Sequence, residues 1–513
     1  MLRPMAAVHA LVLSALALLG MAHVQAAPDD PYASSTGAWS QDFADQWALT
    51  QQRIYADIAP TATGQPVIVA VIDTGLDYTH EDLAAERIWH NPNETANGRD
   101  DDRNGYVDDL IGWNFVAGSN NPWDESGHGT HIAGVIGACT NNGVGIAAVN
   151  SNAILMPLKV ANFVGQARSA NVAAAIYYAV DHGARVINIS LGSELITDLE
   201  VRAAEYAQER NVLIVVSAGN RGLSTEQHGY AGLPGALVVG ALAPNGERAG
   251  FSNFGEGLHL LAPGVDVLSL RAQDTDFVLL SDPLDYAAGS AVVGEDQQYY
   301  RASGTSFAAA VATGVASRVL SLRPDLSARA VKKLLTQTAA DLGVPGHDQV
   351  SGFGGLDYLA AFAGDPTRHL DVRLSHAGLV LDEARLLVEV SGRAESSDFR
   401  TAELQMRPLP DSIPLPPAAT DKAGRREERR RAKEVERQKK AGTYVDPYAW
   451  QALANWTESQ PQGVLARLDV EELTRKASGS TAWELRLVVN DERVAHMTLS
   501  MPAPDIFAEA GDE

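Results

Sequence analysis

The sequence of 513 residues contains one cysteine, Cys139. A single cysteine excludes an intramolecular disulfide, so cysteine content gives no information about the compartment in which the protein works. Basic residues are scarce: 40 Lys and Arg stand against 64 Asp and Glu, which leaves a net charge of −24. Such an acidic surface argues against nucleic acid or an anionic membrane as a partner, and it suits a protein that collects cations.

Apolar runs typical of membrane spans are also lacking after the N-terminus. Near the N-terminus, Arg3 is followed by an apolar run over residues 10–19 and by small residues around Val24 and Ala26, where a signal peptidase would cut. The pattern predicts a signal peptide over residues 1–26 and a secreted or periplasmic protein, with no stable membrane insertion after cleavage. A membrane anchor is the alternative, but the run is too short to span a bilayer comfortably.

Short apolar runs alternate with helical patterns over residues 66–365, within an expected main domain of residues 27–365. Continuous apolar runs suit parallel strands buried on both faces, and the alanine-rich segments between them suit helices. We therefore expect an α/β domain with a doubly wound, mostly parallel sheet flanked by helices. The expected strands cover residues 67–72, 186–191, 212–216 and 237–239, and the expected helices cover 171–179 and 199–207.

The character of the sequence changes after Gly364. Residues 369–406 and 463–500 alternate apolar and polar side chains, which predicts antiparallel strands in a smaller β-rich C-terminal domain. We expect this domain to begin over residues 366–407 and to resume over residues 443–513.

A linker over residues 408–442 separates these two parts of the C-terminal region. It begins with a proline-rich stretch that should be extended. It continues with a charged run over residues 421–440 that holds ten basic and five acidic residues. A solvated helix or disordered linker is one interpretation of this run. A helix that docks on the acidic main domain is the other.

Three segments carry residues suited to nucleophilic catalysis. Asp73 ends an expected strand in VAVIDTG, His128 lies in SGHGTHIAG, and Ser306 lies in SGTSFAA at the expected start of a helix. A serine hydroxyl is a weak nucleophile and needs an adjacent base, which a histidine supplies near neutral pH. A buried aspartate fixes the tautomer of that histidine and stabilises the imidazolium. Glycines beside the histidine and before the serine allow backbone and substrate to approach closely.

These segments, in the order Asp, His, Ser, resemble the motifs of the subtilisin family. The resemblance covers residues 40–365. It implies an exported serine endopeptidase that acts on polypeptide through an acyl-enzyme intermediate, with Asp73, His128 and Ser306 as its triad. A narrow-specificity maturation protease or transpeptidase of the same fold is one alternative, and a non-catalytic binding protein is another. The complete set of catalytic residue types argues against the last.

The same resemblance implies roles for residues around the triad. Asn220 follows the expected strand over residues 212–216 and is similar to the asparagine that donates to the tetrahedral oxyanion, together with the Ser306 backbone N–H. An ordinary turn residue is the alternative for Asn220. The substrate-binding residues are implied to be Ser190, Leu191 and Gly192, which form an edge that pairs with an extended peptide, together with Ala218 and Gly219.

Calcium is the expected cofactor, at two places. In an acidic loop, oxygen ligands alternate and a glycine stands sixth, as at the start of an EF-hand loop, although Ile111 replaces the usual glutamate at position twelve. A solvated acidic loop is the alternative. The candidate ligands in this loop are Asp100, Asp102, Asn104, Tyr106 and Asp108. For the second place, the resemblance implies the side chains of Asp82 and Asn142 and the carbonyl groups of Thr140, Val144 and Ile146.

Two hypotheses concern the region after residue 365, which is large enough to be an independent domain. Asp73 follows the expected cleavage site too closely to leave room for the N-terminal propeptide usual in the family. One hypothesis is therefore that the C-terminal region contacts the catalytic domain and restrains it until the exposed linker is cut. The other is a tethered substrate-binding or cell-surface domain.

Overall fold

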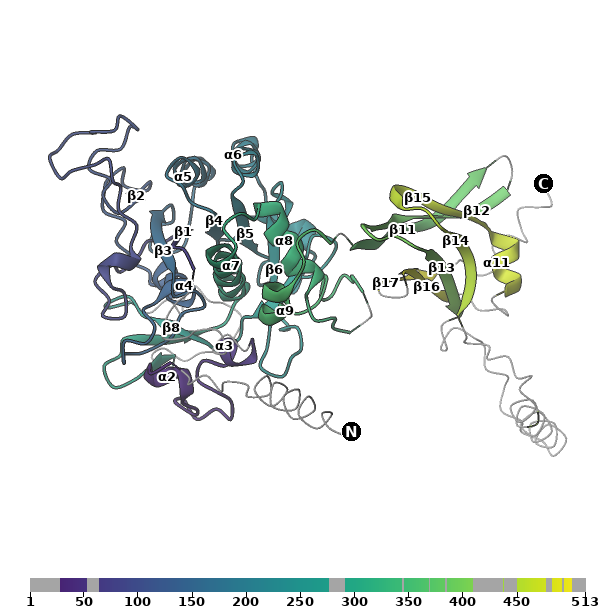
Figure 1. Ribbon diagram of the computed structural model, residues 1–513, viewed down its shortest axis with the longest axis horizontal. Coiled ribbons are helices and arrows are strands. Elements are labelled where there is room, and N and C mark those ends of the chain that lie inside the picture. The colour runs from purple at the N-terminus through teal and green to yellow at the C-terminus, as the bar shows by residue number, and fades with distance from the viewer. Residues whose placement is uncertain are drawn as a thin grey trace, which may run out of the picture. The chain divides into compact units, whose positions relative to one another are not determined.

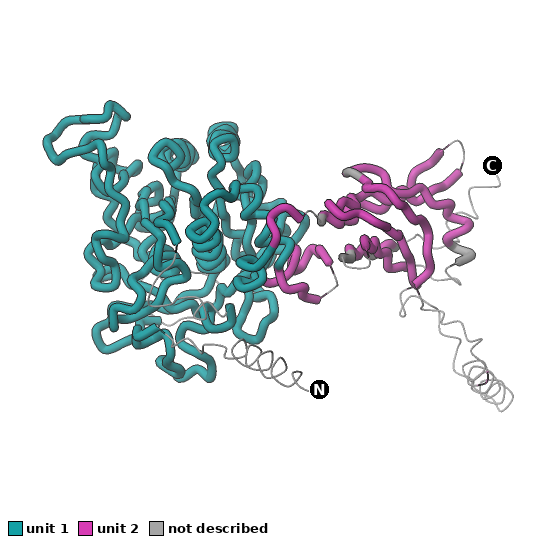
Figure 2. The backbone as a smooth tube through the Cα atoms, in the orientation of Figure 1, with its two compact units in different colours: residues 1–338, 356–364 teal, residues 339–355, 365–513 magenta. Residues whose placement is uncertain are grey.

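The computed structural model describes residues 28–52, 64–275, 291–343, 346–368, 370–382, 385–408, 437, 450–476, 482–490 and 493–500. The signal peptide predicted over residues 1–26 lies outside the described residues, as does nearly all of the linker predicted over residues 408–442. The chain divides into two compact units, which Figure 2 colours separately. The first comprises residues 1–338 and 356–364, and the second comprises residues 339–355 and 365–513.

The first unit is built on a seven-stranded sheet in which every pair of neighbours runs parallel. Its strands are mostly continuous apolar runs that are buried on both faces, as a parallel sheet covered by helices requires. The predicted doubly wound α/β architecture is confirmed. In order across the sheet, the strands are β2 (Trp113–Asn114), β3 (Ala153–Lys159), β1 (Val67–Asp73), β4 (Val186–Ile189), β5 (Leu213–Ser217), β6 (Leu237–Leu242) and β7 (Leu260–Pro263).

Two pairs of helices pack on this sheet (Figure 1). α5 (Ser169–Asp181) and α6 (Asp198–Glu209) pack against each other and on β1 and β5, whereas α4 (His128–Gly137) and α7 (Thr305–Leu322) pack against each other and on β1, β3 and β4 to β7. α7 is long and apolar enough to resemble a membrane span, but 94% of it is buried inside the unit. It is therefore the core helix around which the first unit folds.

A smaller antiparallel sheet and several short elements complete the first unit. The small sheet orders its strands β8 (Val267–Leu270), β10 (Tyr299–Ala302) and β9 (Val292–Val293), and α4 packs on β8. The remaining elements are α2 (Pro31–Ser34), α3 (Trp47–Gln51), η2 (Ala85–Arg87), η3 (Thr225–Gln227), η4 (Gly229–Gly232), α8 (Ala328–Gln337) and α9 (Tyr358–Ala363).

The second unit contains two antiparallel sheets, which confirms the β-rich C-terminal region. Burial alternates along β12, β13 and β16, as expected for sheets with one face on a core. That core includes Val388, Leu404 and Trp483. One sheet orders β11 (Leu370–Asp382), β12 (Arg385–Ser396) and β15 (Gln460–Asp469); the other orders β14 (Gln451–Trp456), β13 (Ala402–Pro408), β16 (Ala482–Val489) and β17 (Arg493–Ser500), and α11 spans Val470–Lys476.

Candidate active site

Asp73 is the last residue of β1, and its side chain is fully buried. Its Oδ1 accepts from the Thr74 backbone N–H at 2.7 Å and from His128 Nδ1, also at 2.7 Å. The strand thus delivers a carboxylate to the carboxyl edge of the parallel sheet, where α/β folds place their sites. Because Nδ1 of His128 donates to Asp73, the Nε2 atom is the one that can accept a proton.

His128 is the first residue of α4, and 15% of its side chain is exposed. Gly127, just before it, has φ 97°, a left-handed conformation that favours glycine. Burial by itself would lower the pKa of His128, but the charge and hydrogen bond of Asp73, with a further contribution from Asp124, raise this pKa above its usual value. The surroundings of His128 therefore favour the imidazolium that a general base becomes after taking a proton.

Ser306 is the second residue of α7, with 8% of its surface exposed. Its hydroxyl donates to the Ser190 carbonyl at 3.1 Å, and the Ser190 hydroxyl donates to the Ser306 carbonyl at 3.0 Å. The rings of His128 and Phe307 lie 5.6 Å apart, centroid to centroid. These contacts bring the first turns of α4 and α7 together beside the segment after β4.

Asn220 lies just beyond β5, and Thr305 holds its side chain in place. Its Oδ1 accepts from the Thr305 backbone N–H at 2.8 Å and from the Thr305 hydroxyl at 2.7 Å. With Oδ1 held in this way, the Nδ2 group is turned toward Gly304, because a Cβ placed on Gly304 would lie 3.4 Å from Nδ2. The amide N–H groups are therefore fixed beside the serine before any substrate arrives.

The residues predicted to bind substrate lie on two segments that flank Ser306. Ser190 and Leu191 are buried and Gly192 is exposed, and a Cβ on Gly192 would meet nothing within 4 Å. The Gly219 N–H donates to the Thr305 hydroxyl at 3.0 Å, and Ala218 donates to Val239 from the end of β5. The sequence did not single out Thr305 as a positioning residue, although it stands inside the serine motif.

The second histidine of the motif, His131, is held in the interior by contacts to backbone carbonyl groups. It is fully buried, and its Nε2 lies 3.1 Å from the Val267 carbonyl and 2.9 Å from the Tyr300 carbonyl. Burial lowers the pKa of His131 to about 3, so this ring stays neutral. It anchors α4 to the small antiparallel sheet, which leaves His128 as the candidate base of this motif.

Asp82 is the centre of the second candidate cation site, the one that the resemblance to the subtilisin family implies. Its carboxylate is fully buried and accepts from Asn142 Nδ2 at 2.8 Å and from the Ile146 N–H at 3.0 Å. Burial, with a smaller contribution from the neighbouring Asp30, raises the pKa of Asp82 to about 7. Asp30, which the sequence did not single out, accepts from the backbone of Asn141 and Asn142.

The Thr140 hydroxyl accepts from the Ala148 N–H at 3.0 Å, and Val144 donates its N–H to Asn142 Oδ1 at 3.0 Å. All five predicted residues thus lie on or beside one loop that folds over Asp82.

The acidic loop gathers a different set of carboxylates from the one its alternating pattern suggested. Oxygen atoms of Glu94, Asp102 and Asp109 all lie within 4.8 Å of one another. The amides of Asn91 and Asn104 each donate to both Asp102 and Asp109, at 2.9 to 3.2 Å. Of the predicted ligands, only Asp102 and Asn104 belong to this cluster.

The other predicted ligands of this loop lie outside the group of three carboxylates and have other contacts. Asp100 accepts from the backbone of Asn104 and Gly105, and Asp108 accepts from the backbone of Asn97 and Gly98. The ring of Tyr106 lies 5.1 Å from that of Tyr178. These contacts stabilise the shape of the loop.

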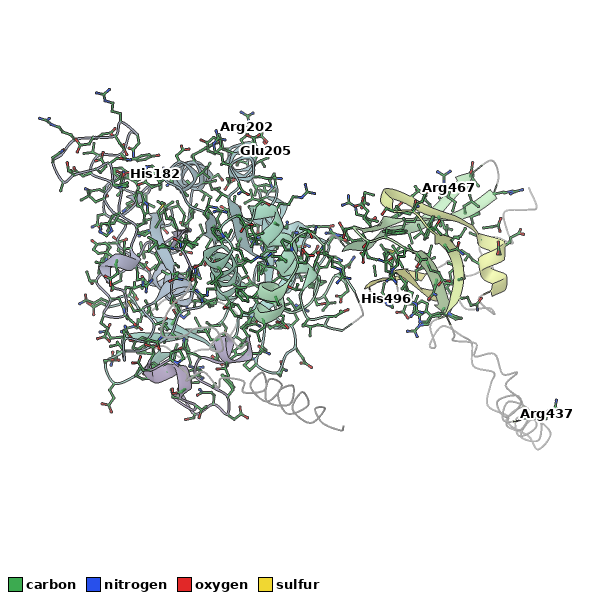
Figure 3. All side chains as sticks on the ribbon, viewed as in Figure 1. His182, Arg202, Glu205, Arg437, Arg467 and His496 are labelled. Carbon is green, nitrogen blue, oxygen red and sulfur yellow. The ribbon has the colours of Figure 1, made fainter. Side chains whose placement is uncertain are left out.

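The cluster is closed on its inner side by α5. The Tyr178 hydroxyl donates to Asp109 at 2.6 Å, and His182, labelled in Figure 3, lies 4.0 Å from the same carboxylate. Burial and the bond to Asp109 raise the pKa of Tyr178 well above its usual value, so the phenol remains a donor. Asp109 is the last residue of the acidic run in the sequence. Glu94 lies before that run, and no pattern in the sequence around it marks it as a ligand.

Comparison with known proteins decides the family. The family model described as the subtilase family matches residues 64–354, more than half of the chain. This chain belongs to the subtilase family. The triad candidates, Asn220 and both substrate-flanking segments all lie within the matched residues.

The chain is similar to several named proteases. A thermophilic serine proteinase of Bacillus sp. (strain AK1) is 36% identical over 213 residues, 42% of this chain and 47% of that protein. Fervidolysin of Fervidobacterium pennivorans is 34% identical over 332 residues, 62% of this chain and 44% of that protein. The chain thus spans less than half the length of these two relatives. A solved lanthipeptide protease superposes with a TM-score of 0.51 at 26% identity, covering 66% of this chain and 98% of that one.

Proposed function

We propose that this subtilase is an exported serine endopeptidase with Asp73, His128 and Ser306 as its catalytic triad. The observation that carries the proposal is the 2.7 Å contact between Asp73 Oδ1 and His128 Nδ1, at the sheet edge where α7 presents Ser306. An aspartate, a histidine and a serine in this arrangement form a charge-stabilised base and a nucleophile. The relatives named as serine proteinases support the same activity.

The proposed reaction begins when the Ser306 hydroxyl turns from the Ser190 carbonyl to His128 Nε2. As Oγ attacks the peptide carbonyl, Nε2 takes the hydroxyl proton, and Asp73 stabilises the imidazolium. His128 then gives this proton to the leaving amine, and the acyl group remains on Ser306. Water attacks the ester in the second half of the reaction, with His128 again as the base, and the free serine is restored.

Asn220 and the backbone N–H of Ser306 are the proposed donors to the oxyanion. Thr305 fixes the Asn220 amide in advance, so little reorganisation is needed when negative charge develops. The start of α7 adds a favourable helix dipole at the same place. The exposed Gly192 suits a substrate backbone that adds alongside residues 190–192 as an extended strand.

We also propose calcium at both clusters, because their donors are carboxylate, amide and carbonyl oxygens, which calcium prefers. Three carboxylates within 4.8 Å at Glu94, Asp102 and Asp109 repel one another without a cation. Rotation of the Asn91 or Asn104 amide would replace an N–H donor by an oxygen ligand. When bound, calcium would supply charge neutralisation that holds the loops in their folded form.

Export and the breadth of substrate choice complete the proposal. The predicted signal peptide supports a secreted or periplasmic location, and one relative is named a cell wall-associated protease of Bacillus subtilis. The substrate proposed is unfolded or extended polypeptide. A narrow-specificity maturation protease is the second candidate, which the structural likeness to a lanthipeptide protease favours.

Digestion of a peptide library, with Ser306→Ala as the matched control, tests this function. We expect the mature protein to cleave many peptides and to be labelled at Ser306 by a serine-directed phosphonate, and we expect the variant to do neither. Cleavage confined to one motif would instead support the maturation protease. Full peptidase activity in Ser306→Ala would disprove the triad, and a folded, unlabelled and inactive wild type would point to a binding protein.

A further inference from the structure

Asp124 is a fully buried carboxylate in the loop before α4, outside the proposed triad. Its Oδ1 accepts from the Thr74 hydroxyl at 2.8 Å, from the Ser126 N–H at 3.0 Å and from the Gly127 N–H at 2.9 Å. Its Oδ2 accepts from the N–H and the hydroxyl of Thr130, at 2.9 and 2.7 Å. Five donors therefore converge on one side chain.

These donors come from both segments that carry the catalytic base and its aspartate. Thr74 directly follows Asp73, while Gly127 and Thr130 lie on either side of His128. The Thr74 hydroxyl also accepts from the Gly129 N–H at 2.9 Å, so it links the end of β1 to the first turn of α4 a second time. The network therefore fixes the two ends of the contact between Asp73 and His128.

A carboxylate is the group that this position requires. All five partners are donors, and an ionised carboxylate offers only acceptors. An amide in the same place would present its own N–H groups to two or three of these donors and leave them unsatisfied in the core. The same negative charge lies at the N-terminus of α4, a helix of ten residues, where the helix dipole favours an anion.

We infer that Asp124 is a positioning residue for catalysis, which holds His128 against Asp73 through Thr74 and the first turn of α4. This inference rests on the proposed function, since it concerns the base of that reaction. Asp124 touches neither substrate nor reacting atoms in the proposed mechanism. Its contribution to the rate comes from the geometry it imposes and from its charge.

The charge of Asp124 reaches His128 as well. The ionisable groups that interact electrostatically with His128 include Asp73 on β1, Asp124 in the preceding loop and His131 on α4. Asp73 and Asp124 both raise the pKa of His128, against its burial. On the far side of Thr74, Lys159 on β3 donates to the Thr74 carbonyl and pairs with Glu125 at 3.2 Å.

Two variants separate the geometric contribution from the charge. Thr74→Val removes the hydroxyl that links Asp124 to α4 and keeps the charge. Asp124→Asn keeps the size of the side chain and removes the charge. Thr74→Ser is the conservative rescue, and Thr336→Val on α8 is the matched control, since it also deletes a buried threonine hydroxyl, one that bonds within its own helix.

We expect Thr74→Val to lower kcat by about 10²-fold with KM changed by less than about threefold, because a small misplacement of a base affects the chemical step. Thr74→Ser should recover most of this loss, and Thr336→Val should show none of it. The acidic limb of the kcat/KM profile should stay in place in Thr74→Val and should move to lower pH in Asp124→Asn, because the neutral base then persists to lower pH.

The controls distinguish this inference from the proposed function. A wild type without phosphonate labelling or hydrolysis would overturn the function itself. An active wild type whose Thr74→Val variant keeps full kcat would overturn the positioning role, and this holds even if Asp124→Asn fails to fold. A loss in Thr74→Val that Thr74→Ser does not rescue, or an equal loss in Thr336→Val, would mean general destabilisation and would also overturn it.

Discussion

Gly129, the second residue of α4, offers the most direct test of how closely the proposed site is packed. A Cβ at this position would stand 2.3 Å from the Gly75 carbonyl oxygen and 3.2 Å from Asp73 Cβ. Both of these atoms belong to the end of β1 and the turn that follows it. Replacement by alanine therefore forces the strand that carries Asp73 away from the helix that carries His128.

The size of the displacement follows from the contact. Cβ atoms essentially never approach another heavy atom within 3.0 Å, so the two segments must separate by about 0.7 Å. The distance between His128 Nδ1 and Asp73 Oδ1 is now 2.7 Å, and a separation of this size would stretch it beyond the usual length of an N–H···O hydrogen bond. We expect Gly129→Ala to lower kcat by about 10²-fold through the misplaced base, and to cost about 1–3 kcal/mol of stability through overpacking.

Hydrolysis of a chromogenic peptide gives the kinetic result, and thermal unfolding in a Ser306→Ala background gives the stability without self-digestion. Gly250→Ala is the matched control, because a Cβ on Gly250 meets nothing within 4 Å. The reasoning fails if Gly129→Ala keeps kcat within about threefold of the wild type. It also fails if Gly250→Ala loses as much activity.

Four further outcomes test other parts of the proposal. Asn220→Ala should lower kcat by about 10²–10³-fold with little change in KM, and an unchanged kcat would remove this amide from the oxyanion site. The acidic limb of kcat/KM should lie above pH 6.5, because the pKa of His128 is raised and its neutral form is the base; a limb below pH 6.5 would contradict this. Chelation should lower the melting temperature, because a ligand of the native state alone stabilises it, and Glu94→Gln should reduce that effect; a melting temperature that ignores chelator and added calcium would refute both cation sites. Deletion of residues 366–513 should leave short-peptide kinetics unchanged and impair only large or insoluble substrates, whereas failed folding or faster peptide cleavage would support a restraining role.

The sheet could be predicted wherever its strands are continuous apolar runs. The run over residues 67–72 is β1 without its last residue, and the run over residues 237–239 is the first half of β6. β3 went unpredicted because Pro157 interrupts its run, and proline is rare inside sheets. The proline is tolerated because β2 pairs only with Leu158 and Lys159 of β3. At Pro157, β3 therefore has a neighbouring strand on one side only, which is β1.

The triad candidates were accessible for a similar local reason. Asp73 is the last residue of a strand, and His128 and Ser306 each lie in the first turn of a helix. The end of a strand and the start of a helix can be predicted from the few residues around them. Thr305, which orients Asn220, could not be recognised as a positioning residue. Its partner lies 85 positions away, and only the packing of α7 against β5 makes them neighbours.

The acidic loop shows the limit of reasoning from spacing. Alternation of oxygen ligands predicts a loop that wraps its own cation. Asp100 and Asp108 accept from backbone N–H groups of the loop, and their part in binding a cation stays a prediction. The carboxylates that converge include Glu94, which lies before the acidic run. A ligand set assembled from separate turns depends on the tertiary fold of those turns, which no local pattern reports.

Asp73, Asp82, Asp109 and Asp124 are all fully buried, and their partners distinguish their roles. A buried charge is costly unless donors or an opposite charge compensate it. Asp124 accepts hydrogen bonds from five neutral donors. These donors compensate its charge without a cation or a proton. Asp73 faces an imidazole that becomes a cation in the proposed reaction, so its charge would be compensated most in the transition state of that reaction. Asp82 and Asp109 each lie beside other carboxylates, so neutral donors alone leave repulsion that a cation would remove. One residue type at equal burial thus suits a scaffold, the proposed catalytic aspartate and two proposed cation sites.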